Sequence, residues 1–90
     1  MYKLKVFTKA DCPKCPAAKT LANEIQKEGK INVEYFDVDK PEGLAEAQLY
    51  SVLATPSLII CKDSPDEEEV KSFRGEAPSK EEFDSAVTES

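Results

Sequence analysis

Two cysteines stand two residues apart where a strand-like run passes into a helical one. The run 3–7 is strand-like, Cys12-Pro-Lys-Cys15 follows it, and an amphipathic segment starts at Ala17. On the first turn of a helix, a Cys-x-x-Cys pair can close a small-loop disulfide, and the unpaired N–H groups there favour a thiolate. We therefore expect a fold in which a strand delivers a reactive dithiol to the start of a helix.

The two cysteines are expected to play different parts. The helix dipole and the cations Lys9 and Lys14 favour a thiolate at Cys12 more than the exposed Asp11 opposes it. Thiols in such settings have pKa values lowered from about 8.5 to roughly 3.5–7.5. Cys12 is thus the expected nucleophile. Cys15, about one turn further on, is the expected resolving thiol and should be less exposed.

Composition limits the classes of protein that remain. Ninety residues with 40% hydrophobic content and no run of eighteen apolar residues predict one small domain over 1–90, expected to be a monomer, with no membrane span. The start 1–7 lacks the features of a secretory signal, so a cytoplasmic location is expected. There, a close cysteine pair is more often redox-active or metal-binding than structural. The net charge of −6 argues against nucleic acid or an anionic membrane as a partner.

The first half of the chain reads as strand, helix, strand, helix. A strand over 3–7 precedes a helix from Pro13 to Gly29, whose expected inner residues are Ala18, Leu21, Ala22 and Ile25. A second strand over 31–38 should pair parallel to the first through a right-handed crossover. A short helix should then begin at Asp39, with Pro41 in its first turn, and run to about Tyr50. Its expected inner residues are Leu44, Ala45 and Leu49.

The second half reads as strand, strand, helix. The unbroken apolar run 58–61 predicts a central strand buried on both faces, in which Cys61 is a small apolar filler. A polar loop with the acidic run 66–69, expected to be solvated, leads to an outer strand over 70–74 that Gly75 closes. A capping box formed by Ser79 and Glu82 begins the last helix. Its expected inner residues are Phe83, Ala86 and Val87.

This βαβαββα order, with Cys-x-x-Cys after the first strand, resembles the thioredoxin fold over nearly the whole chain. The resemblance implies an α/β architecture, a four-stranded mixed sheet flanked by three helices. Thr55-Pro56, with the proline 41 residues after Cys15, looks like the family's cis-proline. By that resemblance, Pro56 would sit against the cysteines, and the backbone of Thr55 would pair with the extended backbone of a substrate.

Within the superfamily the match is mixed. Lys9, three residues before the first cysteine, and Pro13 are similar to glutaredoxins, but Lys14 replaces their tyrosine, and Gly75 stands alone where they have two glycines. The segment 50–58 looks more like thioredoxin. Thioredoxin's buried aspartate, six residues before the first cysteine, is Val6 here. The chain is similar to the small glutaredoxin-like thioredoxins, or redoxins, of bacteria and archaea.

The resemblance and thiol chemistry together predict a thiol-disulfide oxidoreductase, a carrier of electrons through a Cys12–Cys15 disulfide with no bound cofactor. Its partners would be protein disulfides and a donor, either a thioredoxin reductase-type enzyme or glutathione. A glutathione-dependent glutaredoxin is one alternative. A redox-sensing or metal-handling module without turnover is another, but a closed zinc site would need acids or a dimer beside Cys61.

Overall fold

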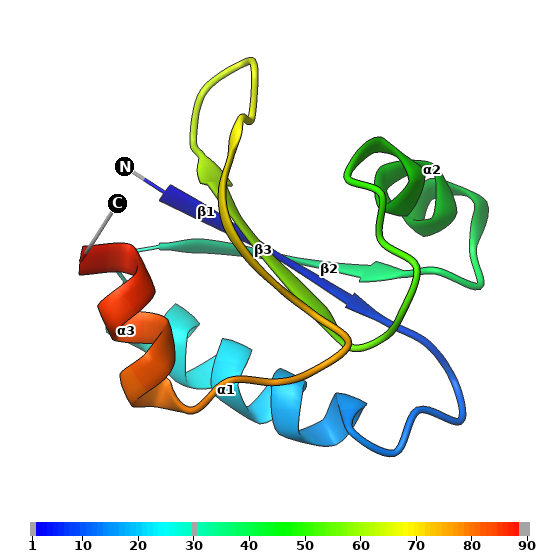
Figure 1. Cartoon of the computed structure of the whole chain (residues 1–90), viewed down its shortest axis with the longest axis horizontal. Coiled ribbons are helices and arrows are strands. Elements are labelled where there is room, and N and C mark those ends of the chain that lie inside the picture. Colours follow the sequence, from blue (N-terminus) through cyan, green and yellow to red (C-terminus); the bar gives the residue numbers. More distant parts are fainter. Residues whose placement is uncertain (1, 30, 89–90) are drawn as a thin grey trace.

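A computed structural model describes residues 2–29 and 31–88 of the chain, and Figure 1 shows it as a cartoon. Seven elements follow one another in the predicted order. They are β1 (Tyr2–Thr8), α1 (Cys15–Glu28), β2 (Asn32–Asp37), α2 (Pro41–Leu49), β3 (Ser57–Lys62), β4 (Glu69–Arg74) and α3 (Lys80–Thr88).

The strands form one mixed sheet in the order β2-β1-β3-β4. β1 pairs parallel with β2, whereas β1 with β3 and β3 with β4 are antiparallel. Helices α1 and α3 cover one face of the sheet and α2 covers the other (Figure 1). The predicted fold class, a four-stranded mixed sheet flanked by three helices, is therefore confirmed.

The two central strands bury side chains on both faces, as the unbroken apolar run in β3 predicted. Leu58 and Ile60 face the layer of α1 and α3, and Ile59 packs on the α2 side with Phe7. All four are fully buried. Burying a side chain of this size contributes about 1.5–3 kcal/mol, so these two strands anchor the fold. Cys61 is also fully buried, as expected.

Two of the predicted helix ends are confirmed in detail. Gly29 caps α1 in the left-handed conformation, with φ of 74°. At the start of α3, the N–H of Glu82 donates to the hydroxyl of Ser79, and the Glu82 carboxylate accepts from the N–H of Ser79. This reciprocal pair is the capping box, and Phe83 and Ala86 point inward beyond it while Val87 is half-buried.

The predicted inner face of α2 is wrong. Leu44, Ala45 and Leu49 are exposed, and the buried residues of this helix are Gly43 and Ala47. A Cβ at Gly43 would overlap the backbone carbonyl of Asp37. The helix therefore approaches β2 through its glycine, because only a residue without a side chain lets the two backbones come so close.

The expected helix cap at Asp39 is also wrong. Lys40 holds the N-cap position of α2 and makes no side-chain capping bond. The carboxylate of Asp39 instead accepts a hydrogen bond from the N–H of Ala10 at 3.3 Å. Asp39 therefore fixes the loop before the cysteines rather than the start of α2.

A lysine in the central strand β1 is buried, which the sequence analysis did not anticipate. The Lys5 side chain is 1% exposed, and its ammonium donates to Glu46 of α2 at 2.5 Å and to Glu67 of the β3–β4 loop at 3.0 Å. Its Nζ also lies 4.9 Å from the ring centroid of Tyr50. Burial lowers the pKa of Lys5, but the hydrogen bonds outweigh burial and leave it above its ordinary value.

The acidic run 66–69 was predicted to be solvated, and this prediction is wrong for Glu67. Glu67 turns inward and accepts hydrogen bonds from Lys3 at 2.8 Å and from Lys5. These bonds lower the pKa of the Glu67 carboxyl below its ordinary value. The β3–β4 loop is thus tied to β1 by charge, and α2 is tied to the same lysine through Glu46.

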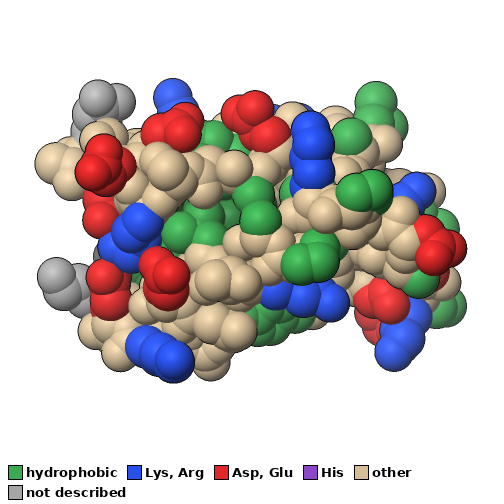
Figure 2. Space-filling view, turned by 90° about the horizontal axis from the view of Figure 1, so that it is seen from below, with side chains coloured by type: hydrophobic (Ala, Val, Ile, Leu, Met, Phe, Trp, Pro, Cys, Tyr) green, Lys and Arg blue, Asp and Glu red, His purple; other side chains and the backbone are tan. Residues whose placement is uncertain are grey.

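The molecular surface on the side of α1 and α3 carries positive and negative side chains mixed together. In Figure 2, Lys and Arg side chains alternate with Asp and Glu around an apolar strip. A surface that collects the phosphates of a nucleic acid carries clustered cations instead. Among residues 2–29 and 31–88, no helix is both long enough and apolar enough to cross a bilayer.

We predict that Glu67→Gln lowers the free energy of unfolding by about 1 kcal/mol near pH 7, since a charged, half-exposed hydrogen-bond acceptor is lost. The lowered pKa means that unfolding takes up protons. The contribution of Glu67 is therefore complete above the ordinary pKa of 4.5 and is lost as the pH falls through the folded-state value. The free energy of unfolding, measured with urea at several pH values in this range, should fall less steeply toward acid in the variant than in the wild-type protein.

Glu68→Gln is the matched control for this prediction. Glu68 pairs only with Lys62 among the ion pairs seen in the described residues, and both side chains are more than half exposed. Its removal should change stability by less than about 0.5 kcal/mol. Equal stability curves for the Glu67 and Glu68 variants would contradict the inward role of Glu67.

Candidate active site

Cys12 and Cys15 form a disulfide at the start of α1, with their Cα atoms 5.3 Å apart. The helix begins at Cys15, so Pro13 lies ahead of it and Pro16, rather than Pro13, occupies the first turn. A proline is tolerated there because the first N–H groups of a helix have no intrahelical partner. The predicted start of the helix at Pro13 was thus two residues early, and Pro16 causes no break.

The two sulfur-bearing residues differ in exposure. Cys15 is 2% exposed and packs in the inner stripe of α1, whereas Cys12 is partly exposed. The expectation that Cys15 is the more buried is confirmed. An incoming partner can therefore approach Cys12 from solvent, while Cys15 is reached through Cys12.

The charges around the pair lie at the surface. Lys9, Asp11 and Lys14 are all exposed, and Lys14 is the N-cap residue of α1. The first turn of α1 carries no acidic side chain, so nothing on the helix itself opposes a thiolate at its N-terminus. The carboxylate of Asp11, next to Cys12 in the sequence, is exposed and so is screened by water and salt.

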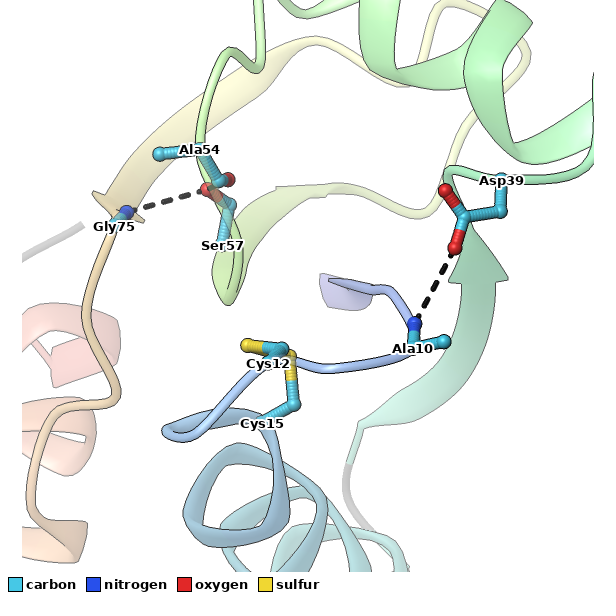
Figure 3. The surroundings of a disulfide bond; sticks show 7 residues. All are labelled: Ala10, Cys12, Cys15, Asp39, Ala54, Ser57 and Gly75. Carbon is cyan, nitrogen blue, oxygen red and sulfur yellow. Dashed lines mark hydrogen bonds between the residues drawn. A yellow bond between two sulfur atoms is a disulfide. The ribbon is translucent and has the colours of Figure 1, made fainter.

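The predicted proline loop lies opposite the disulfide. The Thr55-Pro56 peptide bond is cis, as the resemblance implied. Pro56 is buried and Thr55 partly exposed. Figure 3 shows the disulfide facing the turn that carries Ala54 and Ser57, with Gly75 to one side. The loops that carry Cys12, Ala54 and Gly75 thus lie around the disulfide.

Two polar residues that hold these loops were missed in the sequence analysis. Asp39 binds the N–H of Ala10, two residues before Cys12. Ser57, which is fully buried, donates to the carbonyl of Ala54 at 2.6 Å and accepts from the N–H of Gly75 at 3.3 Å. A polar residue opening an otherwise apolar strand was the available signal for Ser57. Asp39 gave no such signal, because its place beside Pro41 also suits a helix cap.

No carboxylate is buried in the described part of the chain, and the buried charged side chain there is Lys5. Val6, at the position of thioredoxin's buried aspartate, is fully buried in the apolar core between the sheet and α1. Lys5 points to the opposite face, toward α2. The surroundings of Cys15 on this side are therefore apolar.

The third cysteine does not join the pair. Cys61 lies near the far end of β3, where its thiol is 3.7 Å from the carbonyl oxygen of Lys3. Burial raises the pKa of the Cys61 thiol, which suits a packing residue rather than a nucleophile. Within residues 2–29 and 31–88, no three acidic or cysteine side chains gather as a metal ion would require.

Comparison with known proteins points to one family. Residues 2–88 match the family model described as Thioredoxin domain. A "Thioredoxin" of Methanocaldococcus jannaschii is 36% identical over 68% of this chain and 72% of its own. A "Probable Thioredoxin" of Methanothermobacter marburgensis is 34% identical over 99% of this chain and 95% of its own. One from Archaeoglobus fulgidus is 33% identical over 67% of this chain and 66% of its own, just under two thirds of that relative.

Solved structures share the architecture. Thioredoxin 1 of Thermosipho africanus superimposes with a TM-score of 0.77 at 25% identity, covering 97% of this chain and 91% of that one. A mutant thioredoxin from Halobacterium salinarum gives a TM-score of 0.81 at 22% identity. That match covers 98% of this chain and 73% of that one, and at this identity it supports the fold alone.

We predict that, after reduction, iodoacetamide labels Cys12 before Cys15, because only Cys12 is accessible and it lies at the open end of α1. The labelling rate should reach half its maximum at a pH below the value of about 8.5 that is typical of free cysteine. Mass spectrometry of quenched samples reads both the site and the rate. Faster labelling of Cys15, or a profile matching free cysteine, would contradict the roles given to the two residues.

Proposed function

This chain belongs to the thioredoxin family and is a dithiol–disulfide oxidoreductase, and from that premise we propose that it reduces protein disulfides in the cytosol. The observation that carries the proposal is the pairing of an accessible Cys12 with a buried Cys15, opposite the loop that contains Pro56. An accessible attacking thiol backed by a shielded one is what stepwise disulfide exchange requires.

The proposed reaction begins with the reduced protein. The Cys12 thiolate attacks one sulfur of a partner's disulfide, forming a mixed disulfide and releasing the partner's other sulfur as a thiolate. Cys15 then loses its proton and attacks the Cys12 sulfur, which breaks the mixed disulfide and releases the second partner thiolate. Two electrons pass to the partner, and Cys12–Cys15 is left oxidised. A donor must then return two electrons.

Thr55 and Pro56 are proposed to receive the partner's chain. Lys9, Thr55, Leu53 and Leu44 of α2 are among the residues that line a groove of about 250 Å³. Leu53 is 97% exposed and Leu44 48%. Exposed apolar side chains in a groove that also includes Thr55 suit contact with a partner protein. An extended segment pairing with the backbone of Thr55 would lie at the mouth of this groove.

Four residues are assigned supporting parts in this proposal. Lys9 and Lys14 add positive charge near the attacking sulfur, and Pro13 restricts the backbone between the cysteines. Gly75 adopts φ of 79° and comes close to Ala54, since a Cβ there would lie 3.5 Å from the Ala54 methyl. This close approach brings the loop after β4 against the proline loop.

The direction of electron flow is proposed to be reductive. Potentials of proteins with this motif run from roughly −270 mV for thioredoxin to about −120 mV for the strong oxidant DsbA. The two residues between the cysteines are Pro13 and Lys14, with no histidine to add hydrogen-bond stabilisation of the thiolate. A less stabilised thiolate favours the oxidised form of the carrier, which makes its dithiol a better reductant.

Single substitutions should separate the two cysteines. We expect Cys12→Ser to abolish turnover of protein disulfides, because the attacking sulfur is lost. Cys15→Ser should form the mixed disulfide and stop there, so incubation with an oxidised protein substrate should yield a covalent complex sensitive to dithiothreitol. Non-reducing electrophoresis reads both results. Full turnover by either variant would refute the assigned roles.

The electron donor can be tested directly. We expect reduction of insulin when a thioredoxin reductase and NADPH are supplied, and little reduction of hydroxyethyl disulfide with glutathione. The lone Gly75, where glutaredoxins have two glycines, favours this outcome. The reverse pattern would assign the chain to the glutathione-dependent class, in which the cation of Lys9, beside the groove, would bind a glutathione carboxylate.

A further inference from the structure

The buried hydroxyl of Ser57 joins the two loops that flank the disulfide. Ser57 opens β3 and is fully buried in a strand whose next four residues are apolar or cysteine and equally buried. Burying a hydroxyl costs free energy unless it forms hydrogen bonds, so a serine at this place needs partners. Both partners of Ser57 are backbone groups of loops beside the active cysteines.

One oxygen atom serves both loops. Ser57 Oγ donates to the carbonyl of Ala54, which closes the turn that contains Thr55 and Pro56. The same oxygen accepts from the N–H of Gly75, the first residue after β4. Figure 3 shows this second bond between the loop with Gly75 and the turn with Ala54 and Ser57.

Another hydrogen bond ties the beginning of the segment 50–57, which contains Pro56, to the end of β4. Arg74, the last residue of β4, donates from Nη2 to the carbonyl of Tyr50 at 2.8 Å. The Arg74 guanidinium is itself paired with Glu69 at 2.9 Å. The segment 50–57 is therefore held to the end of β4 at both of its ends, by Arg74 at one and by Ser57 at the other.

We propose that Ser57 is a positioning residue for disulfide exchange, holding the turn with Thr55 and Pro56 at a fixed distance from Cys12. The proposal rests on the proposed function, in which Thr55 receives the partner's backbone. Attack on a disulfide needs the three sulfurs nearly in line, and a small misplacement of bound groups lowers the rate strongly. A partner bound through the turn is aligned with Cys12 only while the turn is held.

This position predicts a selective effect of removing the hydroxyl. A protein disulfide that binds along the turn depends on where Thr55 lies. A small aromatic disulfide such as dithiobis(nitrobenzoate) meets Cys12 by collision and needs no backbone pairing. Loss of the Ser57 hydroxyl should therefore impair reaction with the protein and leave reaction with the small disulfide nearly unchanged.

The test compares Ser57→Ala with Ser57→Thr, which keeps the hydroxyl, and with Cys61→Ala, a truncation at a buried position further along β3. Dithiothreitol as electron donor for insulin, and pre-reduced protein freed of dithiothreitol for the single-turnover reaction with dithiobis(nitrobenzoate), avoid any dependence on the natural reductase. We expect Ser57→Ala to lower kcat/KM for insulin by about three- to tenfold, with the rate toward dithiobis(nitrobenzoate) within about twofold of wild type. Ser57→Thr should restore kcat/KM, and Cys61→Ala should leave both rates unchanged even where it lowers Tm.

The other outcomes overturn the proposal. An unchanged kcat/KM for insulin in Ser57→Ala, or an equal loss toward both disulfides, would show that the hydroxyl does not position the partner. The same fall in kcat/KM in Cys61→Ala would assign the effect to lost stability.

Hydrogen exchange gives a reading that does not depend on catalysis. The Gly75 amide should exchange faster in Ser57→Ala than in Ser57→Thr, and equal exchange would refute the link between the loops. If the wild-type protein reduced neither insulin nor the small disulfide, the proposed function would fail. The exchange rates would still decide whether Ser57 joins the two loops.

Discussion

The antiparallel pairing of β1 with β3 is the constraint on which the active site depends. Because the two strands run in opposite directions, the end of β1 lies beside the beginning of β3, with Phe7 opposite Ser57. The chain leaves β1 toward the cysteines and enters β3 from Pro56. The cysteines and Pro56, which are more than forty positions apart in the sequence, thereby follow and precede neighbouring strands at the same end of the sheet. The cysteines need no direct bond to the proline loop to be placed opposite it.

Buried apolar contact holds this pairing, and charge then ties the outlying parts to it. The two central strands pack between helices on both faces, and their register leaves one lysine, Lys5, inside the α2 layer. An unpaired charge there would be strongly destabilising, whereas Lys5 has two carboxylates and an aromatic ring around it. Since the carboxylates come from α2 and the β3–β4 loop, one buried cation specifies how two separate segments attach to the sheet.

The elements that sequence reasoning found are those whose signal is local. The order of helices and strands along the chain, the glycine that ends α1, the capping box of α3 and the buried β3 follow from periodicity and capping residues, which do not depend on distant contacts. The inner face of α2 was wrong because Gly43 meets the backbone of Asp37, a contact set by how the helix docks rather than by hydrophobicity. Glu67 was expected to be solvated with the rest of the acidic run, and the burial of Lys5 was not anticipated, since only the fold brings the two together. Asp39 read as a helix cap for the same reason.

The site works by placement rather than by a buried charge. With Val6 where thioredoxin has its buried aspartate, the interior behind Cys15 is apolar, and among residues 2–29 and 31–88 no carboxylate is buried there. In the proposed reaction, the proton of the resolving thiol would then leave through the opening that admits the partner. The proposed resolving step would thus be coupled to departure of the partner's thiolate, which is itself a base. The accessible Cys12, the shielded Cys15 and a firmly held proline loop provide the geometry that such a coupled step requires.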